Sequence, residues 1–218
     1  MKKKKDELSK IDKLFLDAQK KLGSSNYSVK KMKEFLKKKG ASKNETLEII
    51  SKLRKYSFLD EEEIVKDIIS YADIKHYGYN KIITMLRSRE IDEKLITKIK
   101  KDDSREEYQS KELVKSLVKR YKNKNTLNLK RNIYSALIRY GYDVNIASIR
   151  ADEVYISPIE EINVLKLEYG KLLSSYSRKY IDATNIEERI KDKLISKGFR
   201  LNDIRKVEKE LIHNYEMD

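Results

Sequence analysis

The sequence predicts an all-α protein built from tandem three-helix repeats, with four units forming an elongated, curved array. Three observations predict it: apolar residues recur at helical spacing, a ten-residue helix-end pattern repeats four times, and turn-forming residues are scarce. Glycine and proline together number only seven in 218 residues, which disfavours a β-rich fold with frequent tight turns. Charged residues make up 39% of the chain, as expected of helices with large solvated faces.

Amphipathic helices are predicted wherever apolar residues recur three and four positions apart. Such spacing is found in four stretches of the first 121 residues: Met32, Phe35, Leu36; Leu47, Ile50, Leu53; Ile64, Ile68, Tyr71, Ala72; and Leu113, Leu117, Val118, Tyr121. Helix starts are marked by Ser42 with Glu45 and by Asp60 with Glu63, which have capping-box spacing. The segment 154–158, which holds the only proline, is predicted to be a linker.

A helix-end pattern recurs four times without gaps. Its marker residues are Gly40, Glu90, Gly141 and Gly198, which stand 50, 51 and 57 residues apart. Apolar residues stand eight and four positions before each marker and one after it: Met32, Leu36, Ala41; Ile82, Leu86, Ile91; Ile133, Leu137, Tyr142; and Ile190, Leu194, Phe199. Because positions i and i+4 share one face of a helix, each pair predicts a buried stripe.

A glycine just past a helix end closes the helix at low cost, and the apolar residue after it folds back over the last turn. Two positions after the markers, Ser42, Asp92 and Asp143 are N-caps for a following helix. Arg200 breaks this pattern, and Asn202 and Asp203 are predicted to replace it. We therefore expect a basic tail over 1–10 and units over 11–55, 56–103, 104–153 and 154–218, the last with its linker. The alternative is coincidence among helices of a Lys- and Ile-rich chain.

Three stretches of the second unit follow one another in a characteristic order. They are Phe58-Leu59-Asp60-Glu61, Tyr77-Gly78-Tyr79-Asn80-Lys81-Ile82 and Leu86-Arg87-Ser88-Arg89-Glu90-Ile91. In this order they resemble the central signature of the RecX family, the regulators of bacterial RecA recombinase. That signature runs from a Leu-Asp-Asp/Glu helix start through Gly-x-Gly-Pro-x-x-Ile to a Leu-Arg-x-Lys-Gly-Ile/Val helix end. Residues 27–32 and Lys197-Gly198-Phe199 resemble the family's first and closing motifs, so the similarity covers roughly residues 14–211.

Three residues depart from the family pattern. His76 and Glu90 replace glycines, and Tyr79 replaces the proline. The resemblance implies a non-enzymatic, negative modulator that binds the groove of the RecA filament on single-stranded DNA and restrains strand exchange, coprotease activity and ATP turnover. A repeat array with a concave surface suits a helical filament, and a net charge of +14 suits a partner whose core is DNA. RecA is then the expected partner, with single-stranded DNA bound directly or through RecA, and the protein a monomer.

No catalytic or cofactor site is predicted. The chain has no cysteine, His76 and His213 lie far apart in the sequence, and the six glycines stand singly. The acidic residues 60–63 could hold Mg²⁺, but acids that open a helix are expected from capping and the helix dipole. We predict no enzyme, no cofactor and no metal. No apolar run is long enough to span a membrane, and no secretory signal is found, so a cytoplasmic protein without membrane contact is expected.

Basic residues interleaved with tyrosines are the candidate contacts for a partner or nucleic acid, because cations bind phosphates and tyrosine rings stack on bases. The candidates are Lys75, Tyr77, Tyr79, Lys81, Arg87, Arg89, Lys119, Arg120, Tyr121, Lys122, Lys124, Lys130, Arg131 and Arg139. The structural alternative is that the tyrosines pack between helices while the cations complete helix C-termini. Three functions stay open: a RecA-filament modulator, a helical nucleic-acid-binding protein without a recombinase partner, and a basic scaffold for an acidic protein.

Overall fold

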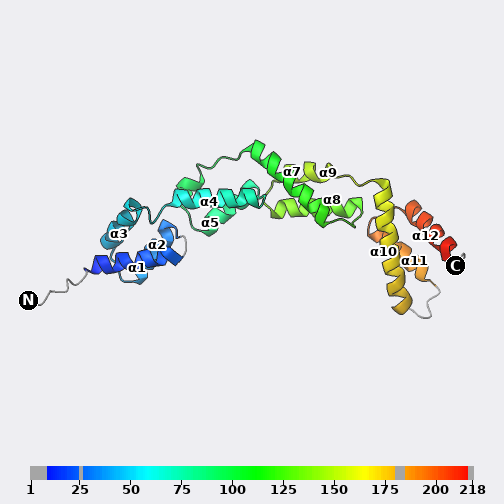
Figure 1. Cartoon of the computed structure of the whole chain (residues 1–218), viewed down its shortest axis with the longest axis horizontal. Helices are drawn as coiled ribbons and strands as arrows, with labels where there is room; N and C mark the ends of the chain where they lie inside the picture. The colour runs from blue at the N-terminus through cyan, green and yellow to red at the C-terminus, as the bar shows by residue number, and fades with distance from the viewer. Residues whose placement is uncertain (1–8, 25–26, 180–184, 216–218) are drawn as a thin grey trace, which may run out of the picture. The chain divides into compact units, whose positions relative to one another are not determined.

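The computed structural model describes residues 9–24, 27–179 and 185–215, without the side chains of 179 and 212–215. Over these residues the chain is helical and has no strand, which confirms the all-α class (Figure 1). The helices are α1 (Lys10–Ser24), α2 (Val29–Lys38), α3 (Lys43–Lys55), α4 (Glu61–Ile74), α5 (Tyr79–Ser88), α6 (Glu93–Ile96), α7 (Asp103–Arg120), α8 (Thr126–Arg139), α9 (Val144–Asp152), α10 (Pro158–Lys179), α11 (Ile186–Ser196) and α12 (Leu201–Tyr215). The chain divides into two compact units, Met1–Gln109 and Ser110–Asp218.

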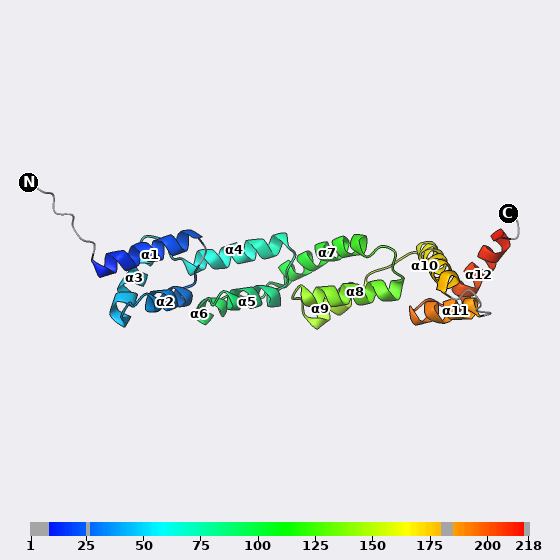
Figure 2. The same cartoon turned by 90° about the horizontal axis from the view of Figure 1, so that it is seen from below.

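The first compact unit contains two apolar clusters. One joins α1, α2 and α3, which lie beside one another in Figure 2, and its centre includes Met32, Leu36 and Leu53. The other joins α4, α5 and α6 and includes Ile82 and Leu86. Each cluster combines helices that follow one another along the chain.

The second compact unit contains two further clusters. One unites α7, α8 and α9 around Leu117, Ile133 and Leu137. The other unites α10, α11 and α12 around Leu165 and Leu194. Each of the four predicted repeat units thus contains one cluster, while the unit boundaries and the curved array stay predictions.

The four predicted helix-end turns have one shared backbone geometry. The markers Gly40, Glu90, Gly141 and Gly198 have φ of 83°, 58°, 92° and 88°. In each turn the residue after the marker donates its amide to the carbonyl of the stripe leucine, at 3.0 to 3.2 Å. This is a Schellman closure, which satisfies carbonyls that the helix end leaves open. The stripe residues of all four turns are at most 3% exposed.

Glu90 occupies a left-handed position that glycine holds in the other three turns. Its carboxylate lies 3.2 Å from the ammonium of Lys30, which belongs to α2. His76, which also replaces a family glycine, has φ of 53° and closes α4 in the same way, since the Tyr77 amide donates to the Ala72 carbonyl at 2.8 Å. Both departures from the family pattern keep the backbone shape that the glycine would adopt.

The predicted helix starts at Ser42 and Asp60 are confirmed, and the one predicted at Asn202 and Asp203 is wrong. Ser42 and Glu45 form a complete capping box, and Asp60 accepts the amides of Glu62 and Glu63. Asn202 and Asp203 do not cap the last helix, because α12 begins at Leu201 and both lie inside its first turn.

The proline prediction was also partly wrong. Pro158 is the first residue of α10 rather than part of the linker, a position where its missing amide costs nothing. Ser157 and Glu160 bond reciprocally across this helix start. At the other end of the chain, Ser9 accepts the Asp12 amide, so α1 begins inside the predicted tail.

Candidate functional site

The α4–α5 junction brings four of its side chains into one row. The Tyr71 and Tyr77 rings meet edge to face with centroids 6.1 Å apart. The Lys75 ammonium lies 5.8 Å from the Tyr71 centroid, and the Lys81 ammonium lies 5.8 Å from that of Tyr77. Lys75 and Tyr71 are exposed, while Tyr77 and Lys81 are half-buried. We call these residues the junction row; Tyr71 was not among the candidates, because its helical spacing predicted a buried residue.

Tyr79 forms hydrogen bonds within the first compact unit. Its hydroxyl donates to the Ile99 carbonyl at 3.1 Å, and its amide donates to a Glu106 carboxylate oxygen at 2.9 Å. The side chain is half-buried. These contacts give Tyr79 a structural role at the start of α5.

The two arginine candidates of α5 lie at its other end. Arg87 is exposed and forms an ion pair of 2.6 Å with Glu93. The hydrogen bond from Arg87 lowers the pKa of the Glu93 carboxyl, and the same bond raises the pKa of Arg87. Arg89 is exposed and has no ion pair with the described acids. The structure therefore does not bring this pair together with the junction row.

A polar network holds the start of α7 against the α4–α5 junction. His76 and Gln109 share a hydrogen bond of 2.5 Å, and the Arg105 Nε donates to an Asp73 oxygen at 2.7 Å. Arg105 also donates to the Tyr77 carbonyl at 3.1 Å. The sequence does not single out these residues, since the partners stand 28 to 33 positions apart.

The second compact unit holds the other cation cluster, around the end of α7 and the start of α8. Lys119, Arg120, Lys122 and Lys124 are exposed and form no ion pair with a described acid. We call these four residues the α7-end cluster. Tyr121 is half-buried and packs against the cluster of α7–α9. Lys119 and Arg120 stand in the last turn of α7, where the helix dipole favours cations.

The remaining candidates lie along α8. The Lys130 ammonium is half-buried and donates to the Asp152 carbonyl at 2.9 Å, so it joins α8 to the end of α9. Arg131 is exposed one turn from the start of α8, and Arg139 is exposed at its last residue. Of these three candidates, Lys130 is thus used within the fold, while Arg131 and Arg139 are exposed.

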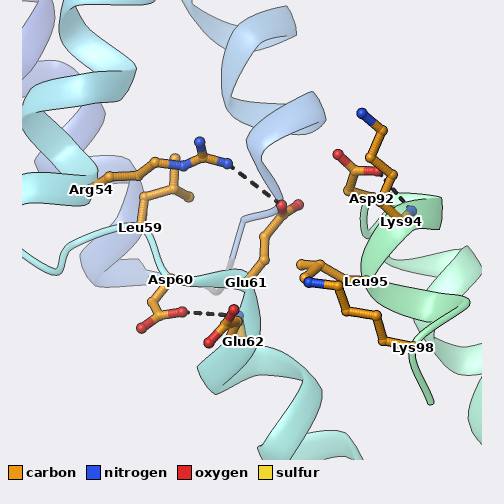
Figure 3. Close-up of a pocket in the computed structure, with 9 residues that line it drawn as sticks. All are labelled: Arg54, Leu59, Asp60, Glu61, Glu62, Asp92, Lys94, Leu95 and Lys98. Atoms are coloured by element: carbon orange, nitrogen blue, oxygen red, sulfur yellow. Dashed lines mark hydrogen bonds and ion pairs between the residues drawn. The ribbon is translucent and has the colours of Figure 1, made fainter. Parts of the chain in front are cut away.

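A hollow of about 500 Å³ lies between α3, the start of α4 and α6 (Figure 3). Three of its four acidic groups are used in the fold: Asp60 and Asp92 cap helices, and Glu61 lies 4.0 Å from the Arg54 guanidinium. No group of three or more His, Cys, Asp or Glu among the described residues is arranged to hold a metal ion.

None of the helices in the described part is long and apolar enough to cross a membrane. The side chain of His213 lies outside the described part.

A large excess of positive charge also lies outside the candidate residues. Residues 9–55 contain 14 Lys and Arg against five Asp and Glu, whereas residues 56–103 contain nine against 11. On α2, Lys33 and Lys37 are exposed one turn apart and have no ion pair within the described part. A count of charge by segment would have found this surface from the sequence.

The chain is similar to proteins of known name. Regulatory protein RecX of Bacillus subtilis (strain 168) is 28% identical over 189 residues, which cover 84% of this chain and 70% of that protein. Regulatory protein RecX of Bacillus mycoides (strain KBAB4) is 24% identical over 199 residues, covering 89% and 73%.

No family model matches the chain. A crystal structure of RecX from Lactobacillus salivarius is 18% identical and aligns over 92% of this chain and 96% of its own, at a TM-score of 0.29. That score is too low to carry an argument, so the relation rests on the two sequence relatives. The resemblance to the RecX family that the helix-end motifs predict is therefore confirmed.

Proposed function

We propose that the protein is a negative modulator of RecA that binds in the groove of the RecA filament on single-stranded DNA and restrains strand exchange, coprotease activity and ATP turnover. The observation that carries the proposal is the similarity to two proteins named Regulatory protein RecX over 84% and 89% of the chain. Both are named as regulators, and neither name describes an enzyme. The protein would act as a monomer in the cytoplasm, without a cofactor.

The exposed cations supply a physical means of binding. The α7-end cluster presents four cations that no described acid neutralises, and Lys75 of the junction row is likewise unneutralised. Such groups would contact acidic side chains of the filament or the phosphates of its DNA. Because the two sets belong to different compact units, we expect several weak contacts whose combined effect exceeds each one alone.

A second function is nucleic-acid binding without a recombinase. It is favoured by the same unneutralised cations, which would attract any polyphosphate. The two functions differ in one measurable respect: a filament modulator binds RecA-coated single-stranded DNA far more tightly than the bare strand. Equal affinity for both would favour the second function.

The test is strand exchange and ATP turnover by the cognate RecA, with the wild-type protein and two charge reversals. One variant replaces Lys75 and Lys81 with Glu, and the other replaces Arg120, Lys122 and Lys124 with Glu. A matched control replaces Arg205, Lys206 and Lys209, exposed cations of α12, with Glu, so that it has the same change in net charge as the second variant.

Wild type should inhibit both activities, and both test variants should inhibit less while their circular dichroism stays helical. The control should inhibit like wild type. If wild type at saturation changes neither activity, the proposed function is wrong. If the control loses inhibition as strongly as the matched triple variant, net charge rather than the α7-end cluster is responsible.

A further inference from the structure

We infer that Glu61, Glu106 and Glu161 are positioning residues, each of which joins the first helix of one predicted repeat unit to the second helix of the unit before it. Each carboxylate binds the amide of the first residue of that second helix. The residues bound are Val29 of α2, Tyr79 of α5 and Thr126 of α8. We call these three contacts the joints.

The first joint lies beside the hollow of Figure 3. Glu61 Oε1 accepts the Val29 amide at 3.0 Å, across 32 residues of sequence. Glu61 is only 6% exposed although it stands in the first turn of α4, where a carboxylate usually faces water. In Figure 3 its carboxylate points away from its own helix start and toward Arg54, whose guanidinium lies 4.0 Å away. Ser28, the residue before α2, accepts the Lys31 amide with its side chain. Glu61 and Ser28 thus each satisfy one amide in the first turn of α2, Val29 and Lys31 respectively.

The second joint has the same form at α5. Glu106 Oε1 accepts the Tyr79 amide at 2.9 Å and a hydrogen bond from Arg105 at 3.2 Å. Glu106 is 1% exposed. The residue before α5 is Gly78, which has no side chain to cap with, so the carboxylate from α7 takes over part of the capping.

The third joint lies in the second compact unit. Glu161 Oε1 lies 3.4 Å from the Thr126 nitrogen, and Oε2 accepts the Thr126 hydroxyl at 2.8 Å. Here Asn125 caps the Asn128 amide, as Ser28 caps Lys31 at α2. All three joints share a first helical amide and a glutamate supplied 27 to 35 residues later in the chain, and the joints at α2 and α8 share a capping residue as well.

The joints are electrostatically favourable at this place in a helix. The first amides of a helix have no partner inside it and carry partial positive charge, so a buried carboxylate both satisfies the donor and interacts with the dipole. Loss of a buried partner leaves the donor unsatisfied and costs more than the bond itself contributes. A helix pair held in this way has one preferred register.

A fixed register between helices of successive predicted units matters for the proposed function. This part of the inference rests on that proposed function. If several units bind one filament together, the gain over a single contact depends on how closely their spacing matches the sites. Once one unit is bound, the next unit binds at an effective concentration set by this match. Looser joints would lower that concentration without removing any contact residue. The joint glutamates would therefore affect inhibition although none belongs to the candidate contacts.

The test compares Glu61→Ala, Glu61→Gln and the control Glu62→Ala in the full chain. Glu62 is an exposed neighbour in the same helical turn, so the control removes an equal charge near the helix start without removing a joint. Hydrogen exchange of the Val29 amide is the primary measurement. It should quicken about tenfold or more in Glu61→Ala and stay near wild type in Glu62→Ala. Glu61→Gln should fall between, because its carbonyl oxygen still accepts the amide but lacks the charge.

Unchanged Val29 exchange in Glu61→Ala would overturn the inference. Exchange that quickens equally across all of α2 and α4 in both Glu61→Ala and Glu61→Gln would also overturn it, since that result indicates general unfolding. The Tyr79 amide, held by its own joint, should exchange as in wild type.

Inhibition of strand exchange is the second measurement. Glu61→Ala should inhibit less than Glu62→Ala, and Glu61→Gln should recover part of the difference. If Glu61→Ala quickens Val29 exchange yet inhibits as Glu62→Ala does, the joint has no part in positioning and the inference fails. If wild type itself does not inhibit, the proposed function fails, while the hydrogen-exchange result still decides whether the joint exists.

Discussion

Gly198 has a left-handed backbone and a close side-chain neighbour, so Gly198→Ala should be destabilising. Its φ is 88°, and a Cβ built there would lie 2.6 Å from Leu127 Cδ2, at the start of α8. The left-handed conformation costs a non-glycine residue about 1–2 kcal/mol. The near atom is the end of a flexible leucine side chain that is 43% exposed and can move aside at low cost, and the stiffer unfolded chain returns about 0.4–1 kcal/mol. The expected loss in the free energy of unfolding is therefore about 1–2 kcal/mol, strain with a small addition for moving Leu127.

Two matched variants separate these contributions. Gly40→Ala has a similar φ of 83° but no atom within 4 Å of the new Cβ, so strain alone should cost about 1 kcal/mol. Gly170→Ala lies inside α10 with nothing within 4 Å, and alanine should stabilise that helix by about 0.5–1 kcal/mol.

The assay is urea denaturation followed by circular dichroism, with thermal unfolding as a check. The expected order of stability is Gly170→Ala above wild type, then Gly40→Ala, then Gly198→Ala. A Gly198→Ala loss no larger than that of Gly40→Ala would show that Leu127 moves aside without resisting the new Cβ. The contact between the turn before α12 and the start of α8 is also supported by Asn125 and Asn128, whose amides donate to the Lys197 carbonyl at 2.7 Å.

Two further predictions concern the core and the capping box. Leu137→Ala should lower the free energy of unfolding by about 2–5 kcal/mol in denaturant titration, because Leu137 is 0% exposed; a loss under about 0.5 kcal/mol would contradict the predicted stripe. The Glu45 carboxyl has its pKa lowered from 4.5 to about 2, mainly by the hydrogen bond from the Ser42 amide. Because the folded pKa is the lower one, the stabilisation is complete above pH 4.5 and is lost as the pH falls through about 2. The difference in unfolding midpoint between wild type and Glu45→Gln should shrink over that interval, and a constant difference would contradict it.

The helix-end turns show what can be predicted from sequence. A marker with its flanking apolar residues, such as Leu137, Gly141 and Tyr142, lies within one helical turn and the residue after it. Every interaction that defines the turn is therefore local, and the pattern predicted both the left-handed marker and the buried stripe. Ser42 with Glu45 was predictable for the same reason.

Predictions that depended on helical spacing alone were less accurate. Leu47 and Tyr71 fit their amphipathic patterns, yet they are 60% and 45% exposed. Spacing shows which residues share a face, but the neighbouring helices decide how much of that face they cover. Pro158 shows a different limit, because a proline can end one segment or begin the next, and only Ser157 and Glu160 in place show that it begins a helix.

The sequence by itself determined the all-α class and the four helix-end turns, because these depend on backbone preferences and side-chain spacing within single helices and turns. It also determined the resemblance to RecX, because that depends on the order of such local motifs along the chain. Only the tertiary structure decided which cations are left without acidic partners, that Tyr79 forms hydrogen bonds within the first compact unit, and that Glu61 reaches Val29. Those contacts join residues 20 to 32 positions apart, and their partners are set by how helices pack. A glutamate in a first helical turn has the same local sequence signal whether it faces water or caps another helix, and burial against the neighbouring helix makes the difference.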